Sequence, residues 1–358
     1  GTIKEALAFD DILMLPRYSN VLPINTNISL NLTNKINLKV PFLSSAMDTV
    51  TESNMAIAMA KAGGIGVIHR NLKINIQSEE IKKVKRKNLL VGAAIGTNEE
   101  DLERARALLD NGVDLIVIDT AHGHSEKVIK VLSKLKKING KTAICVGNIA
   151  TGEAAKELYN SGADIIKVGI GPGSICTTRM VAGIGVPQIS AIMEVKKKLN
   201  KKKIKIISDG GIKFSGDIAK ALAAGADAIM MGSIFAGTDE SPGKKFKVKG
   251  KIYKRYRGMG SIGAMSAGSA NRYFQKNYKD KSKFVPEGVE GRVEYKGSIS
   301  KIIYQLQGGL RSSMGYIGAK NLNEIRKKAK FIKITKAGFY ESMVHSVEMT
   351  QKTINYKL

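Results

Sequence analysis

The strongest candidate for chemistry is a cysteine that follows a glycine-rich turn. The segment Gly169-Ile-Gly-Pro-Gly-Ser-Ile leads into Cys176, and Thr177, Thr178 and Arg179 follow it. A thiol on such a loop, beside local dipoles and cations, is a candidate nucleophile, and the thiolate is the reactive form. A free cysteine is otherwise a small buried hydrophobe. The polar surroundings favour a nucleophile at Cys176, whereas Cys145, within the apolar run 142–146, is predicted to be core.

Two other glycine-rich segments indicate a phosphate site. Asp209-Gly210-Gly211 and Gly232-Ser233 each end an apolar run, and free backbone N–H groups at such ends bind anions. Asp209 and Asp119 could accept hydrogen bonds from ribose hydroxyls, although an aspartate at such a position also serves as a helix N-cap. The combination makes a phosphorylated ligand the favoured one.

Other site types are poorly represented. His122 and His124 stand two residues apart with no third ligand at a suitable spacing, whereas zinc sites use three or four ligands. The sequence has no P-loop, and no helix follows Gly169–Gly173 as a dinucleotide fingerprint requires. We therefore expect neither a zinc site nor a Rossmann nucleotide site.

The elements that must position these residues form a regular series. Continuous apolar runs of this length predict parallel strands buried on both faces, with amphipathic helices between them. Eight such units predict a (β/α)8 barrel, with a doubly wound open sheet as the alternative. The active groups of such barrels lie at the carboxyl ends of the strands. The predicted strands are 41–45, 64–69, 89–95, 114–119, 141–147, 164–169, 204–209 and 227–232, and four intervening helices are 98–111, 125–137, 152–161 and 215–224.

The connection after the eighth strand is too long for an ordinary loop. It runs to a predicted helix at 299–307, and connections of this length are usually functional. We call residues 244–295 the flap; it contains a lysine-rich hairpin at 246–256 and a Gly/Ser/Met stretch at 258–268. The tail 331–358 is predicted to lie outside the barrel.

The charge balance is strongly basic. Lys and Arg number 58 and Asp and Glu 31, a net charge of +27, which would suit a polyanion partner. Lysine predominates, however, and lysine usually fills solvated faces. The sequence has no Trp and few aromatic residues on which bases could stack, so nucleic-acid binding is expected only as a side activity. Two cysteines, no bilayer-length apolar run and no signal-like segment predict a cytoplasmic protein without membrane association.

Taken together, the motifs resemble those of the inosine monophosphate (IMP) dehydrogenases along nearly the whole chain. That family oxidises IMP to xanthosine monophosphate with NAD for guanine nucleotide synthesis, aided by a monovalent cation such as K+. The resemblance rests on these stretches: Phe42-Leu-Ser-Ser-Ala-Met-Asp-Thr-Val50, Asp119-Thr-Ala-His-Gly-His-Ser125, Gly169–Thr178, Asp209-Gly-Gly211, Tyr256-Arg-Gly-Met-Gly-Ser261, Asn271-Arg-Tyr-Phe274 and Pro286-Glu-Gly-Val-Glu-Gly291.

The resemblance implies a covalent mechanism. Cys176 would add to the purine C2, a hydride would pass to NAD, and water would hydrolyse the resulting thioimidate. After NADH leaves, Arg272 and Tyr273 on the flap would enter the vacated site and activate that water. Arginine is an unusual base because its pKa exceeds about 12. Thr178 with Glu287 is the alternative route, and both remain open at this point.

The resemblance also implies the binding residues and the assembly. The cation would lie among backbone carbonyls of the cysteine loop and of a neighbouring subunit, in a homotetramer. Substrate would be held by Ser44, Met47, Ser174, Asp209, Gly211, Gly232, Ser233, Tyr256, Gly258, Met259, Gly260 and Glu287; NAD by Asp119, Thr120, Ala121, Gly169, Ile170 and Gly171; and the cation by Gly171, Gly173, Cys176, Glu341, Ser342 and Met343.

One departure from the family pattern concerns regulation. Most members insert a pair of nucleotide-binding CBS modules after the second strand, near residues 85–89 of this chain, where the sequence leaves no room for them. We therefore expect one catalytic domain over residues 1–358. Guanosine monophosphate reductase is the nearest alternative; it shares the cysteine motif but does not need the Arg272-Tyr273 flap.

Overall fold

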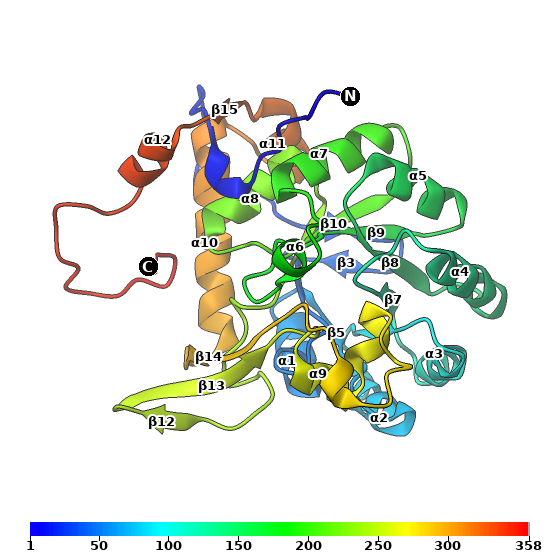
Figure 1. Ribbon diagram of the computed structural model, residues 1–358. Coiled ribbons are helices and arrows are strands. Elements are labelled where there is room, and N and C mark those ends of the chain that lie inside the picture. Colours follow the sequence, from blue (N-terminus) through cyan, green and yellow to red (C-terminus); the bar gives the residue numbers. More distant parts are fainter. Residues whose placement is uncertain (357–358) are drawn as a thin grey trace.

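The computed structural model describes residues 1–356, and its centre is a closed barrel of eight parallel strands (Figure 1). The predicted (β/α)8 fold is confirmed, and each predicted strand overlaps an observed one. The barrel strands are β4 (Phe42–Ser44), β5 (Ile65–Ile68), β6 (Gly92–Ile95), β7 (Leu115–Asp119), β8 (Ala143–Ile149), β9 (Ile165–Val168), β10 (Lys205–Asp209) and β11 (Ala228–Met231), paired in that order with β11 closing on β4.

Helices form a ring outside the barrel. Each turns an apolar face inward, as α4 does with Val128, Val131, Leu132 and Leu135, because a 3.6-residue period places such residues on one side. The covering helices are α1 (Ser53–Lys61), α2 (Ile74–Lys85), α3 (Glu100–Asp110), α4 (Glu126–Ile138), α5 (Gly152–Asn160), α7 (Gln188–Lys198), α8 (Ser215–Ala224), α10 (Ile299–Ile317) and α11 (Leu322–Lys328).

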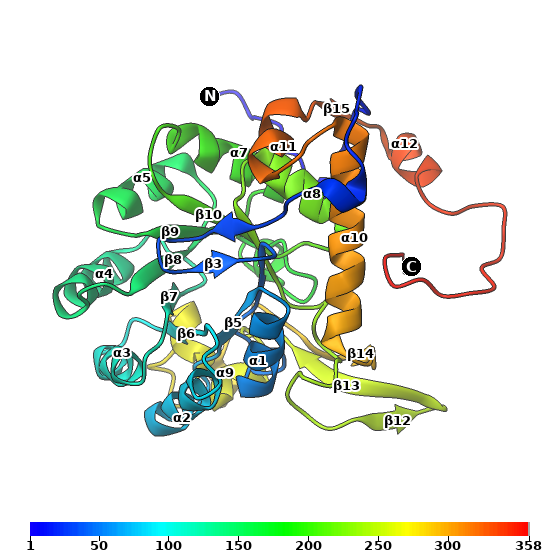
Figure 2. The same ribbon diagram turned by 180° about the vertical axis from the view of Figure 1, so that it is seen from behind.

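The apolar core has two parts: one lies between the strands and the surrounding helices, and the other fills the inside of the barrel. Val117 on β7, Cys145 on β8 and Ile207 on β10 belong to the inner part and are fully buried. Burial raises the pKa of the Cys145 thiol to about 12, so this cysteine is a core residue, as predicted. The hairpin of β2 (Leu30–Asn31) and β3 (Asn37–Leu38), which the sequence did not indicate, adds its apolar side chains at the amino end of the barrel (Figure 2).

The flap departs from the barrel as an antiparallel sheet. Its strands β12 (Phe246–Val248) and β13 (Lys251–Arg257) form the predicted hairpin, and β14 (Glu290–Glu294) adds a third strand. Between β13 and β14 the chain forms α9 (Ile262–Ala267) and the 3-10 helices η3 (Ser269–Tyr273) and η4 (Lys281–Lys283). The stretch 258–268 is therefore helical in part.

One predicted helix is longer than expected. Helix α10 continues to Ile317 instead of ending at Gln307, because Gly308 and Gly309 stay helical where α10 packs against α8. The tail lies outside the barrel: β15 (Phe331–Lys333) pairs with the N-terminal strand β1 (Ile12–Met14), and α12 (Lys336–Glu341) follows.

Between α2 and β6 the chain makes only a short connection, from Arg86 to Val91. No further domain is inserted there. Within residues 1–356 no helix is both long and apolar enough to cross a membrane.

Candidate active site

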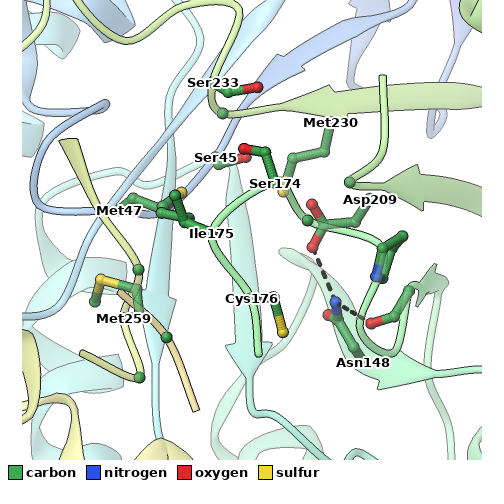
Figure 3. A pocket seen from close by; sticks show the side chains of 18 of the residues that line it. Ser45, Met47, Asn148, Ser174, Ile175, Cys176, Asp209, Met230, Ser233 and Met259 are labelled. Carbon is green, nitrogen blue, oxygen red and sulfur yellow. Dashed lines mark hydrogen bonds between the residues drawn. The ribbon is translucent and has the colours of Figure 1, made fainter. Parts of the chain in front are cut away.

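A cavity opens at the carboxyl ends of the barrel strands, and Cys176 lies on its wall (Figure 3). Helix α6 (Thr178–Val181) begins directly after this cysteine loop. The cavity brings together most residues predicted from the sequence: Met47, Asp119, Gly169, Gly171, Gly173, Ser174, Cys176, Asp209, Gly211, Gly232, Ser233, Tyr256, Gly258, Met259, Gly260, Arg272, Tyr273 and Glu287.

The cysteine is joined to a carboxylate through a hydroxyl group. Cys176 Sγ lies 3.3 Å from Thr178 Oγ1, which donates a hydrogen bond to Glu287 Oε1 at 2.8 Å. The Thr177 amide also donates to the Glu287 carbonyl oxygen at 2.8 Å, so the flap residue Glu287 is fixed against the cysteine loop. The geometry gives a path by which a proton can move from the thiol or from nearby water toward the carboxylate.

A buried lysine that the sequence analysis missed organises the two aspartates. Lys167 Nζ lies 2.9 Å from Asp119 Oδ1 and 2.9 Å from Asp209 Oδ2, and Asn148 Nδ2 donates to Asp209 Oδ2 at 2.9 Å. Burial acts to lower the pKa of Lys167, but the two carboxylates outweigh it and raise the value. The two aspartates therefore have a structural partner. The sequence did contain an indication of this site, because a lysine within the apolar run 164–169 must be buried and therefore needs a carboxylate partner.

The flap inserts an arginine beside the same aspartate. Arg272 Nη1 lies 2.5 Å from Asp119 Oδ2, and the Ala121 amide donates to the Arg272 carbonyl at 3.2 Å. Burial acts to raise the pKa of Asp119, but the charges of Arg272 and Lys167 lower it well below its usual range. Burial acts to lower the pKa of Arg272, and Asp119 outweighs this effect and raises it. In this arrangement the guanidinium is firmly protonated.

Residues at the end of β5 hold the flap down. Arg70 Nη1 donates to Asn271 Oδ1, and Asn71 Nδ2 donates to the Ala264 carbonyl at 3.2 Å and to Asp48 Oδ2 at 3.1 Å. Arg70 and Asn71 directly follow the predicted strand 64–69, but no sequence motif assigned them a role. The flap partners Asn271 and Ala264 lie about two hundred residues away along the chain, so only the tertiary structure shows these two contacts.

The opposite wall combines glycines and small polar side chains. Gly211 has φ +83, a region that favours glycine, and a Cβ at Gly169 would lie 2.2 Å from the Asp209 carbonyl oxygen. Glycine at position 169 therefore lets the cysteine loop pack directly against the end of β10. Ser45, Ser174 and Ser233 also line the cavity.

One predicted substrate contact does not face the cavity. Ser44 is fully buried in β4 and its hydroxyl accepts a hydrogen bond from Thr51 at 2.8 Å. Ser45 lies in the lining instead, because consecutive side chains of a strand alternate between faces. Other predicted residues outside the lining are Thr120, Ala121, Ile170, Thr178, Glu341, Ser342 and Met343.

The predicted cation ligands are divided between two places. Within residues 1–356 the carbonyls of Gly171 and Cys176 accept no hydrogen bond, whereas Gly173 O accepts one from the Cys176 amide at 3.2 Å. Two free carbonyls on a tight loop fit a weakly hydrated monovalent cation. Glu341, Ser342 and Met343 lie at the end of α12, which stands at the outer edge of the molecule, away from α6 (Figure 1).

The two histidines of the 119–125 motif are not brought to a metal centre. His124 Nε2 lies 2.5 Å from Glu157 Oε2, and burial and His124 lower the pKa of His122. Over residues 1–356 no group of three or more His, Cys, Asp and Glu side chains is arranged to hold a metal ion.

Comparison with known proteins agrees with these motifs. Residues 6–345 match the family model for the IMP dehydrogenase / GMP reductase domain. The chain is 49% identical to an inosine-5'-monophosphate dehydrogenase of Cryptosporidium parvum, with 99% of this chain and 98% of the relative covered. It is 46% identical to the enzyme of that name from Borreliella burgdorferi (96% and 98% covered) and 41% identical to that from Aquifex aeolicus (99% and 98% covered).

The alignment with the Aquifex relative spans 483 positions, more than the 358 residues of this chain, so part of that relative has no counterpart here. The family model covers most of the chain, and the Cryptosporidium relative is aligned with 99% of it. The chain is an oxidoreductase that belongs to the IMP dehydrogenase / GMP reductase family, among the inosine-5'-monophosphate dehydrogenases.

Proposed function

We propose that this chain oxidises IMP to xanthosine monophosphate with NAD through a covalent intermediate on Cys176. The observation that carries the proposal is the Cys176–Thr178–Glu287 hydrogen-bonded chain on the wall of the cavity. A nucleophile within reach of a group that accepts its proton is the arrangement that covalent catalysis requires.

The reaction proceeds in two stages. The Cys176 thiolate forms a bond to the purine C2, and the hydrogen on C2 leaves with its electron pair. A thioimidate remains on Cys176. Water then adds to C2, loses a proton to the enzyme and expels the thiolate, which releases xanthosine monophosphate and restores Cys176.

NAD supplies the hydride acceptor for the first stage. The residues predicted to hold it fit only in part in the observed arrangement, because Asp119 is already paired with Arg272. A ribose hydroxyl and the guanidinium would compete for the same carboxylate. We infer that the flap leaves the site for the first stage and occupies it for the second, a lid motion of the kind known to separate steps in other enzymes.

For the proton of the attacking water, the geometry favours the Thr178–Glu287 route. Asp119 keeps Arg272 protonated, and a protonated guanidinium cannot accept a proton. Glu287 is within hydrogen-bond distance of Thr178, which in turn contacts the sulfur. In this scheme Arg272 supplies positive charge to the site, and its ion pair with Asp119 holds the flap in the closed position.

The glycine-rich wall would hold the substrate. Backbone N–H groups near Gly211 and Gly232, with Ser45 in place of Ser44 and with Ser174 and Ser233, would bind the phosphate. The other predicted contacts, from Met47, Asp209, Tyr256, Gly258, Met259, Gly260 and Glu287, would surround the nucleoside.

The cation and the assembly extend the proposal. K+ would bind the carbonyls of Gly171, Gly173 and Cys176, and residues 341–343 would reach it from another subunit of a homotetramer. The outward position of α12 supports the assignment of residues 341–343 to the cation site of a neighbouring subunit (Figure 1). We place the enzyme in the cytoplasm, with a single catalytic domain over residues 1–358 and no CBS modules.

The direct test is NADH absorbance after mixing the chain with IMP and NAD in K+ buffer. A steady rise is expected. If no NADH forms but guanosine monophosphate consumes NADPH, the chain is a reductase and the proposed direction is wrong. The flap contact between Arg272 and Asp119 favours the dehydrogenase, because the reductase needs no water-activating flap.

A further inference from the structure

A basic cleft lies at the amino end of the barrel, opposite the Cys176 cavity. It is lined by residues that precede β7 to β11 and by the turn of the β2–β3 hairpin, and it encloses about 1380 Å³. Parallel strands all start at one end of a barrel, so the cleft and the catalytic cavity share no residue. Figure 2 views the molecule from this side, with β3 in front.

Cations outnumber carboxylates in the lining. The basic residues are Lys35, Lys136, Lys141, Lys196, Lys202, Lys203, Lys205 and Arg326, and the acidic ones are Asp114, Asp164 and Asp227. All three carboxylates are already engaged by backbone amides of neighbouring strands. Asp227 in addition pairs with Arg326 at 2.6 Å, Asp114 with Lys85 at 2.8 Å, and Asp164 lies 3.7 Å from Lys136.

The other six lysines have no carboxylate within 4.0 Å among residues 1–356. Lys196 and Lys205 are half-buried in the lining, and burial and the charge of Arg326 lower the pKa of Lys196. Uncompensated cations that line one concave surface create a positive potential and attract a multiply charged anion.

We propose that this cleft binds a small oligophosphate, that is, a chain of two or more linked phosphates, either free or as part of a nucleotide. Lysine ammonium groups bind phosphate oxygens through charge-assisted hydrogen bonds. Tyr159 is the one aromatic residue in the described lining, and Lys202 lies over its ring at 5.3 Å, so no surface for stacking successive bases of a nucleic acid exists there.

The experiment is calorimetric titration of the full chain with inorganic tripolyphosphate in the presence of saturating IMP, which occupies the phosphate site near Cys176. The double variant Lys196→Gln/Lys205→Gln is compared with Lys244→Gln/Lys247→Gln, which removes the same charge from exposed lysines of the flap hairpin. We expect Kd to rise about tenfold or more in the first variant and to stay within about twofold in the second.

A parallel titration with ATP distinguishes the two sources. Equal affinity for ATP and tripolyphosphate would identify the phosphate chain alone as the ligand, and tighter binding of ATP would identify a nucleotide. The proposal is overturned if both variants weaken binding equally or if tripolyphosphate binds only in the absence of IMP. It is also overturned if single-stranded oligonucleotides bind more tightly through Lys196 and Lys205. Because the cleft is remote from Cys176, kcat is unchanged in the Lys196→Gln/Lys205→Gln variant.

Discussion

At the residue scale, the proposed chemistry depends on one sulfur atom. Cys176 and Cys145 belong to the same chain but have opposite surroundings. Cys145 is fully buried with a raised pKa, whereas Cys176 is partly exposed on a cavity wall and contacts Thr178. Only Cys176 can reach a substrate, so only this thiol is expected to carry the reaction.

Replacing Cys176 with Ala is expected to lower turnover by about 1000-fold or more, because the covalent route is lost. IMP binding should persist, since the phosphate wall is unchanged. NADH absorbance and IMP calorimetry measure the two properties. As a control, Cys145→Ala should keep normal NADH formation and lower only the free energy of unfolding. Turnover near the normal rate in Cys176→Ala would contradict the nucleophile assignment.

Glu287→Gln should separate the two water-activation routes. The amide keeps a hydrogen-bond acceptor for Thr178 but cannot take a proton, so hydrolysis is expected to slow about 100-fold while the initial burst of NADH remains. Stopped-flow absorbance resolves the burst from the steady state. Arg272→Ala should also keep the burst. If Glu287→Gln hydrolyses normally and only Arg272→Ala accumulates the covalent intermediate, Arg272 is the base.

At the scale of elements, the flap is attached to the barrel by a few polar contacts. Asn271→Ala removes the partner of Arg70 Nη1 in the closed position. Loss of a hydrogen bond to a charged group corresponds to about 1.5–3 kcal/mol, so hydrolysis is expected to slow about tenfold or more. The NADH burst should keep its amplitude. Asn277→Ala, an exposed change on the same segment, is the matched control and should have no effect.

The contact between α8 and α10 offers a stability test with an internal control. A Cβ on Gly309 would lie 2.0 Å from Ser215 Oγ, whereas one on Gly308 would meet nothing within 4 Å. Gly309→Ala is expected to lower the free energy of unfolding by about 1–3 kcal/mol through overpacking. Gly308→Ala should raise it by about 0.5–1 kcal/mol, because alanine is the better helix former. Urea unfolding at one fixed protein concentration checks both, and equal effects would contradict the packing described.

At the scale of the whole molecule, the proposed cation site needs a second copy of the chain. Residues 341–343 stand away from the cysteine loop of their own chain (Figure 1). Replacing K+ with Na+ is therefore expected to reduce NADH formation several-fold without changing the mass measured by light scattering. A monomeric mass with full K+-dependent activity would show that no neighbouring subunit is required.

The net charge of +27 also belongs to this scale. The sequence indicated scattered, solvated lysines, and the structure gathers several of them in one cleft at the amino end of the barrel. The chain order separates these lysines by up to about 170 residues, from Lys35 to Lys205, and the closure of the barrel brings them together.

The sequence by itself determined the barrel and most of the cavity. Periodic apolar runs predict strands and helices directly, and in a parallel barrel the residues after each strand must meet at one end. That rule is sufficient to bring Cys176, Asp209 and Ser233 to one cavity. Cys176 and its threonine also stand in a local motif, so their proximity needed no distant contact.

Only the tertiary structure decided which partners these residues have. Lys167 pairs with Asp119 and Asp209 because closure of the barrel places three different strands around one buried point. Ser44, the last residue of β4, is buried away from the cavity, and Ser45, the next residue, lines it. The Arg272–Asp119 pair joins positions more than 150 residues apart, and a spacing of that length carries no information about contact, because flexible connections of many lengths can close the same distance.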